Sequence, residues 1–129
     1  MRSLRVFKNT WFQRFARKER IADAALCDAV ARAEKGQVDA DLGGSVLKQR
    51  VARPGAGRSG GYRVILLFRA GDRALFAYGF AKSDRGNIGD DELAAFRQLA
   101  AEVLALSGEQ LDALVAAGRF MEVRCDGDG

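Results

Sequence analysis

The alternating pattern from Tyr62 to Phe68 is the feature that most constrains what this chain can fold into. Tyr62, Val64, Leu66 and Phe68 fall on one face of a strand, and Arg63, Ile65, Leu67 and Arg69 fall on the other. Because both faces are partly apolar, the pattern predicts a central strand of a sheet.

A turn and a second strand follow this central strand. Residues 70–73 have turn composition, and residues 74–81 return as an antiparallel neighbour, which predicts a meander. A period of two aligns Phe76, Tyr78 and Phe80 on one face of the second strand. We interpret Phe76 and Phe80 as core residues, whereas Tyr78 fits either the core or a binding surface.

Helical patterns precede and follow these strands. Further elements are expected as strands at 4–8, 45–53 and 120–124 and as helices at 10–19, 22–35, 90–106 and 108–118. Thr10 and Gln13 form a capping-box pattern at the start of the first helix, and Ser107 and Gln110 form another at the start of the last. The first two helices should make a hairpin, followed by a polar loop at 37–44. We therefore predict an α+β fold in one domain over 1–129, with a flexible tail at 124–129.

Composition excludes several classes of function. Of the 129 residues 48% are apolar, enough for one core. The apolar runs are far shorter than the ~20 residues of a membrane span, and no signal core follows residues 1–5, so we expect a cytoplasmic protein without a membrane partner. There is no histidine, and Cys27 and Cys125 show neither metal-binding spacing nor a secretory context. We interpret both cysteines as incidental thiols.

Positive charge is concentrated in the middle of the chain. Residues 43–88 carry nine Lys or Arg and two acidic residues, whereas the whole chain has a formal net charge of +4. Neutralisation of phosphates supplies most of the non-specific affinity for nucleic acids. The middle of the chain therefore predicts a surface that binds a polyanion.

Three cations on the expected strands are candidate site residues. Lys48 and Arg50 are two residues apart, so both project from one strand face, which suits phosphates; an ordinary solvated face is the alternative. Arg63 stands at the head of the apolar central strand, where its planar fork suits phosphate oxygens. The alternative for Arg63 is a structural ion pair with Asp39, Asp41 or Asp84.

Other basic and aromatic residues extend this candidate surface. Arg53 ends the expected strand at 45–53, and Arg58 opens a Gly-flanked turn that enters the central strand, which a simple hairpin connection also explains. Tyr78 and Lys82 share the parity of the second strand, which leads into Arg85. Aromatic rings beside cations suit the stacking of bases over a bound phosphate backbone.

Four motifs in a fixed order carry a family resemblance. They are LGG at 42–44, KxR at 48–50, SGGYR at 59–63 and YGFAKSDRGNI at 78–88. Over about residues 10–123 the chain resembles the RelE/ParE superfamily of toxins from bacterial toxin–antitoxin pairs, in particular its HigB-like branch. The resemblance implies a helical hairpin packed on a twisted antiparallel sheet, with additional C-terminal helices. It also implies an mRNA endonuclease that needs no metal, histidine or other cofactor.

The resemblance also assigns roles to individual residues. The implied catalytic residues are Lys48, Arg50, Arg63 and Lys82, and the implied RNA-binding residues are Arg53, Arg58, Tyr78 and Arg85. Lys48 and Arg50 would hold the RNA and supply the base, Arg63 would clamp the transition state, and Lys82 or Arg85 would protonate the leaving group. The connection between Arg50 and Arg63 is longer than in compact relatives, which leaves open which of the cations beside it reaches the scissile phosphate.

The sequence thus predicts a type II toxin that cleaves mRNA on the translating ribosome by 2′-hydroxyl transesterification and so inhibits translation and growth. A cognate antitoxin with a helix-turn-helix domain would neutralise it. Two alternatives stay open. One is a non-enzymatic inhibitor of gyrase, an activity also found in this superfamily, and the other is a plain RNA-binding module.

Overall fold

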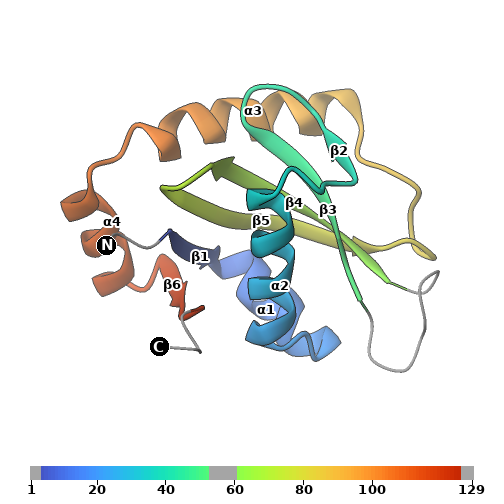
Figure 1. Cartoon of the computed structure of the whole chain (residues 1–129), viewed down its shortest axis with the longest axis horizontal. Helices are drawn as coiled ribbons and strands as arrows, with labels where there is room; N and C mark the ends of the chain where they lie inside the picture. Colours follow the sequence, from blue (N-terminus) through green and yellow to red (C-terminus); the bar gives the residue numbers. More distant parts are fainter. Residues whose placement is uncertain (1–3, 53–60, 126–129) are drawn as a thin grey trace.

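A computed structural model describes residues 4–52 and 61–125 and shows an α+β protein (Figure 1). Its elements are β1 (Arg5–Asn9), α1 (Thr10–Glu19), α2 (Asp23–Glu34), β2 (Ala40–Asp41), β3 (Val46–Val51), β4 (Tyr62–Arg69), β5 (Arg73–Ala81), α3 (Asp90–Leu104), α4 (Gly108–Ala116) and β6 (Phe120–Val123). Every helix and strand expected from the sequence is present. The short strand β2 was not expected, because it lies in the polar loop. Within the described ranges, no helix is long and apolar enough to cross a membrane.

The strands form one mixed sheet in the order β2-β3-β4-β5-β1-β6. The meander of β3, β4 and β5 is antiparallel, and β4 is central, as predicted. The expectation of a wholly antiparallel sheet is wrong at one place, because β1 pairs parallel with β5. Parallel neighbours need a long crossover connection, and the chain from α1 to β4 supplies it. This pairing places the first strand inside the sheet, between β5 and the edge strand β6.

Helices cover both faces of the sheet. On one face α1 and α2, the expected hairpin, bury Phe12, Leu26 and Val30 against Val64 and Leu66. On the other face the C-terminal helices α3 and α4 pack over a second apolar cluster, which consists of Phe7, Val46, Ile65, Leu67, Leu75, Ala77, Ala100, Val103, Leu104 and Leu111. In Figure 1, α3 runs along the top of the sheet, with α2 in front. The burial of both faces explains why the strand residues of β4 are apolar on both sides.

Side-chain caps fix where the helices begin. The hydroxyl of Ser107 accepts a hydrogen bond from the backbone of Gln110, and Gln110 bonds back to Ser107, so the predicted capping box of α4 is present. The cap of α1 differs from the prediction by one residue. Asn9 rather than Thr10 caps this helix, since its side-chain oxygen accepts from Phe12 N–H at 2.8 Å.

A β-bulge in β5 changes which aromatic side chains share a face. Ile65 pairs with Tyr78, but its neighbour Leu66 pairs with Phe76, which leaves Ala77 as the extra residue. The expected alignment of Phe76 with Tyr78 and Phe80 is therefore wrong. Phe76 contacts Phe12 of α1, whereas Tyr78 and Phe80 face the α3 side; Phe76 and Phe80 are both buried, as interpreted from the sequence.

The two cysteines form a disulfide, so their interpretation as incidental thiols is wrong. Cys27 of α2 and Cys125 after β6 are 98 residues apart in sequence, with their Cα atoms 5.3 Å apart. They meet beside a hollow of about 470 Å³ between α2 and the paired strands β1 and β6. Spacing along the chain does not reveal this contact, because only the fold brings the two cysteines together. Of the expected flexible tail, residues 126–129 lie outside the described residues.

Reduction of the Cys27–Cys125 disulfide should lower the free energy of unfolding by about 2–4 kcal/mol, because a bond that closes a long loop restricts the unfolded chain. Thermal unfolding of the oxidised protein with and without reductant measures this effect. The double variant Cys27→Ser/Cys125→Ser should unfold like the reduced protein in both buffers. Equal midpoints for the oxidised and reduced wild type would contradict the prediction.

Candidate functional site

Three cations converge on the face of β3 and β4 that α3 covers in part. Lys48 and Arg50 share one face of β3, and Arg63 of β4 is the direct cross-strand partner of Arg50. On the same face, Val46 and Ile65 belong to the apolar cluster under α3. The same alternation that buries these residues therefore brings the three cations, named here the basic cluster, to one side of the sheet.

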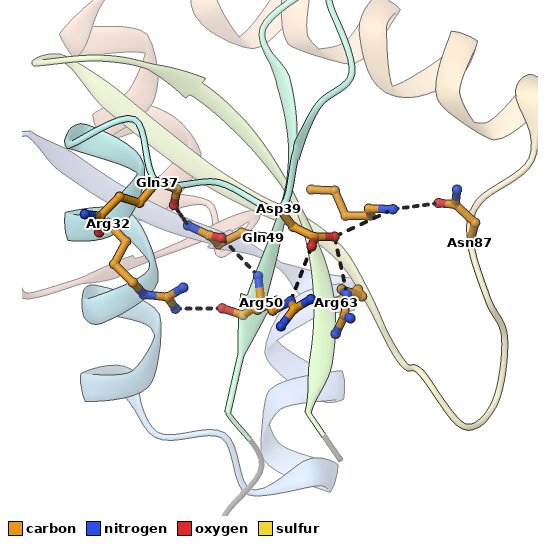
Figure 2. A network of polar contacts seen from close by, with 8 residues as sticks. Arg32, Gln37, Asp39, Gln49, Arg50, Arg63 and Asn87 are labelled. Atoms are coloured by element: carbon orange, nitrogen blue, oxygen red, sulfur yellow. Dashed lines mark hydrogen bonds and ion pairs between the residues drawn. The ribbon is translucent and has the colours of Figure 1, made fainter. Parts of the chain in front are cut away.

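Asp39 lies at the centre of the basic cluster (Figure 2). Its Oδ2 atom is 3.7 Å from Lys48 Nζ and 3.4 Å from Arg63 Nε, and its Oδ1 atom is 3.3 Å from Arg50 Nε. Of the four charged side chains only Arg50 is well exposed, at 58%, while the other three are below 20%. The basic cluster with Asp39 has a net charge of +2, so it remains a site for an anion. From the sequence, Asp39 was expected only as one possible partner of Arg63.

The buried amide of Gln49 holds the segment that carries Asp39. Its Nε2 atom donates to the carbonyl oxygens of Gln37 at 2.9 Å and Ala29 at 3.1 Å, and its Oε1 atom accepts from Arg50 N–H at 3.1 Å. Arg32 of α2 donates to the carbonyl oxygen of Arg50 at 2.7 Å. These bonds, most of them visible in Figure 2, tie α2 and the chain before β2 to strand β3. The chain is thus anchored at Gln37, two residues before Asp39.

Gln49→Leu should lower the free energy of unfolding by about 3 kcal/mol, because leucine keeps the volume but removes the buried hydrogen bonds to three backbone groups. Chemical denaturation followed by circular dichroism measures the loss. Gln98→Leu is the matched control, since the exposed Gln98 makes one weak bond, to Glu102 at 3.3 Å. It should change stability by no more than about 0.5 kcal/mol. An equal loss in both variants would contradict the role assigned to Gln49.

The chain between β5 and α3 approaches the basic cluster through Asn87. Lys48 Nζ donates to Asn87 Oδ1 at 3.5 Å, and the same oxygen accepts from the backbone of Ile88. Lys82 is exposed in the turn after β5, and no described hydrogen bond or ion pair joins it to the basic cluster. The ion pairs therefore bring Lys48, Arg50 and Arg63 together around Asp39, and the predicted role of Lys82 stays a prediction.

Aromatic rings continue the surface on β5. Phe80 is the cross-strand partner of Arg63. The ring centroids of Phe80 and Tyr78 are 6.2 Å apart. The guanidinium of Arg85 lies 5.6 Å from the ring centre of Phe80 and 6.0 Å from that of Tyr78. Tyr78 also stacks at 4.5 Å on Trp11, a partly exposed residue of α1 that sequence analysis did not single out. The sequence feature that could have indicated Trp11 is a large aromatic residue in the first turn of an amphipathic helix.

Arg85 is held by a carboxylate at the start of α3. Two of its nitrogens donate to Glu92, at 2.6 and 3.1 Å, and one also donates to the Tyr78 hydroxyl at 3.2 Å. The hydrogen bonds from Arg85, and then that from Gly89 N–H, hold the pKa of the Glu92 carboxyl below its usual value. Bonds to Glu92 and then to Tyr78 raise the pKa of Arg85. Arg85 is therefore a permanent cation that a carboxylate already neutralises.

A comparison with protein-family models gives the family of the chain. The model that describes the RelE toxin of the RelE/RelB toxin–antitoxin system matches residues 4–123, which include the basic cluster and the aromatic surface. The chain belongs to this RelE toxin family. No curated protein matched the sequence. Family membership makes the protein the toxin of a toxin–antitoxin pair, and its partner is a cognate antitoxin. The resemblance to RelE/ParE toxins is thus confirmed, and its narrower HigB-like branch stays a prediction.

Two further sequence predictions concern RNA contacts and metal binding. Arg53 and Arg58 lie outside the described residues, so their predicted contacts with RNA stay predictions. Among residues 4–52 and 61–125 of the toxin, no group of three or more His, Cys, Asp or Glu side chains is placed to hold a metal ion.

Proposed function

We propose that the toxin is an mRNA endoribonuclease of the HigB-like branch. One observation carries the proposal. Lys48, Arg50 and Arg63 each place a nitrogen within 3.3–3.7 Å of one carboxylate, which is the arrangement that a phosphate group would need. Three cations around one anion stabilise charge that develops on a phosphate during its cleavage.

The proposed reaction uses these cations on a single phosphodiester. The ribose 2′-oxygen attacks the adjacent phosphorus, the bond from phosphorus to the 5′-oxygen breaks, and a 2′,3′-cyclic phosphate and a 5′-hydroxyl are formed. Arg63 and Arg50 donate to the phosphate oxygens and stabilise the pentavalent dianion. Lys48, as the neutral amine, accepts the proton of the 2′-hydroxyl, and Lys82 gives a proton to the leaving 5′-oxygen. Arginine cannot act as the base, because it does not lose its proton in proteins.

A hollow and an aromatic surface flank the basic cluster. The hollow, of about 640 Å³, adjoins Arg50 and Arg63 on the side of α2, and its lining includes Ala25 and Asp28. This volume falls in the range of small-ligand sites. On the other side, the partly exposed ring of Trp11 stacks on Tyr78, beside Arg85, and this aromatic surface could receive a base. RNA would therefore cross β3, β4 and β5, with the scissile phosphate over Arg63.

The charge of the basic cluster also supports a reaction without a metal ion. A divalent cation that approached Asp39 would meet three fixed positive charges within a few ångströms, and like charges repel. Cleavage by the purified toxin should therefore be unchanged by a chelator.

The proposed activity sets the biological context. A toxin that cuts mRNA during translation would act in the cytoplasm, on the ribosome, and would stop growth when its antitoxin is lost. We propose a helix-turn-helix antitoxin as the partner, to be sought in the adjacent open reading frame.

Induction of the toxin in growing cells, with mapping of mRNA 5′ ends, tests the proposed function. New 5′ ends inside translated frames are expected. Intact mRNA together with altered DNA supercoiling would identify a gyrase inhibitor, and intact mRNA with unaltered DNA would identify an RNA-binding module. Cleavage assays of the purified toxin with and without ribosomes then decide ribosome dependence.

A further inference from the structure

The carboxylate of Asp39 lies between the three cations of the basic cluster. Its two oxygens divide the cations, with Oδ1 facing Arg50 and Oδ2 facing both Lys48 and Arg63. Two non-bridging oxygens of a phosphate can receive the same three donors, because carboxylate and phosphate accept bonds in the same geometry. A phosphate and Asp39 would therefore compete for one site.

Three cations so close together destabilise the free protein unless an anion separates them. Lys48 and Arg63 are 16% and 10% exposed, so water screens their charges less well than it screens surface charges. Asp39 supplies the missing anion from within the chain. Without it, the cations would move apart or bind an anion from solution.

Asp39 is also placed where it can leave the site. It directly precedes β2, which has two residues and lies at the edge of the sheet. The Gln49 bond anchors the chain at Gln37, two residues earlier, so a rotation at Asp39 need not disturb the fold. The edge of a sheet has low local stability compared with its centre.

We propose that Asp39 is an internal stand-in for phosphate, which keeps Lys48, Arg50 and Arg63 converged in the free toxin and is displaced when a phosphate group binds. Asp39 thus positions the three cations and also competes with phosphate for them. The identification of the phosphate as that of RNA rests on the proposed function, whereas the exchange of Asp39 for a phosphate does not.

Thermal unfolding of Asp39→Asn in inorganic phosphate tests the exchange. Asparagine keeps the shape of the side chain but removes its charge, so this variant should unfold at a lower temperature than the wild type in a buffer of low ionic strength. Phosphate should bind it at least about tenfold more tightly than it binds the wild type. At a concentration about ten times its Kd, phosphate should raise the midpoint by about 4 °C. Sodium chloride of equal ionic strength should not reproduce this gain.

Asp112→Asn is the matched control. It causes the same change in net charge, but Asp112 pairs with Arg5 at 2.8 Å, near the opposite edge of the sheet. Its response to phosphate should equal that of the wild type. If Asp39→Asn gains no more from phosphate than Asp112→Asn does, the inference is wrong. If Asp39→Asn is unfolded in the buffer alone, refolding by phosphate but not by chloride supports the inference, and failure of phosphate to refold it contradicts it.

A 2′-O-methyl oligoribonucleotide, which cannot be cleaved, links this test to RNA. Asp39→Asn should bind this probe about tenfold more tightly than the wild type at the same salt concentration, with Asp112→Asn close to the wild type. If phosphate stabilises the variant but neither protein binds the probe, the exchange of Asp39 for phosphate is supported. The proposed ribonuclease activity is then contradicted. If the wild type and Asp39→Asn bind the probe with equal affinity, Asp39 does not compete with RNA for the basic cluster.

Discussion

Arg63→Ala should lower the rate of RNA cleavage by about 10²–10³ and abolish growth inhibition, while the protein stays folded. The guanidinium is fixed by Asp39 at 3.4 Å and is 10% exposed, so it is already oriented before substrate binds. Loss of one preorganised donor typically costs about 3–4 kcal/mol of transition-state stabilisation. The cost in folding should be nearer 1 kcal/mol, because Asp39 keeps Lys48 and Arg50 as partners. Single-turnover cleavage and thermal unfolding measure the two effects separately.

Arg69→Ala is the matched control for Arg63→Ala. Arg69 lies at the other end of β4, where it pairs with Asp72 at 3.1 Å and donates to the carbonyl oxygen of Leu104. Its removal should leave cleavage unchanged. Arg63→Lys should recover part of the activity, because it restores the charge but not the two-pronged geometry of the guanidinium. A folded Arg63→Ala protein that is as active as the wild type would remove this residue from the mechanism.

Local patterns in the sequence were sufficient to predict most of the architecture. The alternation at 62–68 predicted a central strand, and the capping pattern at Ser107 and Gln110 predicted the start of α4; both are present. Such features depend on residues only a few positions apart. The parallel pairing of β1 with β5 depends instead on how the whole chain closes, and no short pattern encodes it.

One β-bulge, which the sequence pattern did not indicate, limited the prediction of the aromatic surface. A strict period of two aligned Phe76 with Tyr78, but the bulge at Ala77 reversed the parity between them. The bulge changes which aromatic side chains lie near Arg63. It brings Tyr78 and Phe80 to the face of Arg63 while Phe76 remains in the core beside Phe12. Sequence parity is reliable only within an uninterrupted strand.

Contacts between distant residues were the least predictable part of the site. The pairing of Lys48 and Arg50 on one strand face could be read from their spacing, but the carboxylate between them comes from Asp39, outside the expected strands. Asn87 and the disulfide between Cys27 and Cys125 are likewise visible only in the fold. The sequence therefore indicated a group of cations, and the structure adds the carboxylate that offsets one of their three charges.

Lys48→Arg should lower the cleavage rate by about 10²–10⁴ and leave RNA affinity nearly unchanged. Arginine keeps the positive charge that binds phosphate but cannot become a neutral base, and general base catalysis contributes a factor of this size. Lys48 is favoured over Lys82 as the base because its Nζ atom lies within the basic cluster, near Asp39 and Asn87. Cleavage under single-turnover conditions, with binding of the 2′-O-methyl probe at fixed salt, measures both quantities. Lys35→Arg, an exposed residue after α2, is the control and should behave as wild type.

A substrate with sulfur in place of the leaving 5′-oxygen separates the base from the acid. A thiolate leaves without being protonated, so this substrate bypasses the general acid but still requires removal of the 2′-hydroxyl proton. If Lys82 is the acid, the loss of rate in Lys82→Ala should largely disappear on the sulfur substrate. The loss in Lys48→Arg should persist, because the attack on phosphorus is the same. If Lys48→Arg cleaves both substrates at the wild-type rate, Lys48 is not the base, and cleavage would then depend on stabilisation of the phosphorane charge by Arg50 and Arg63 alone.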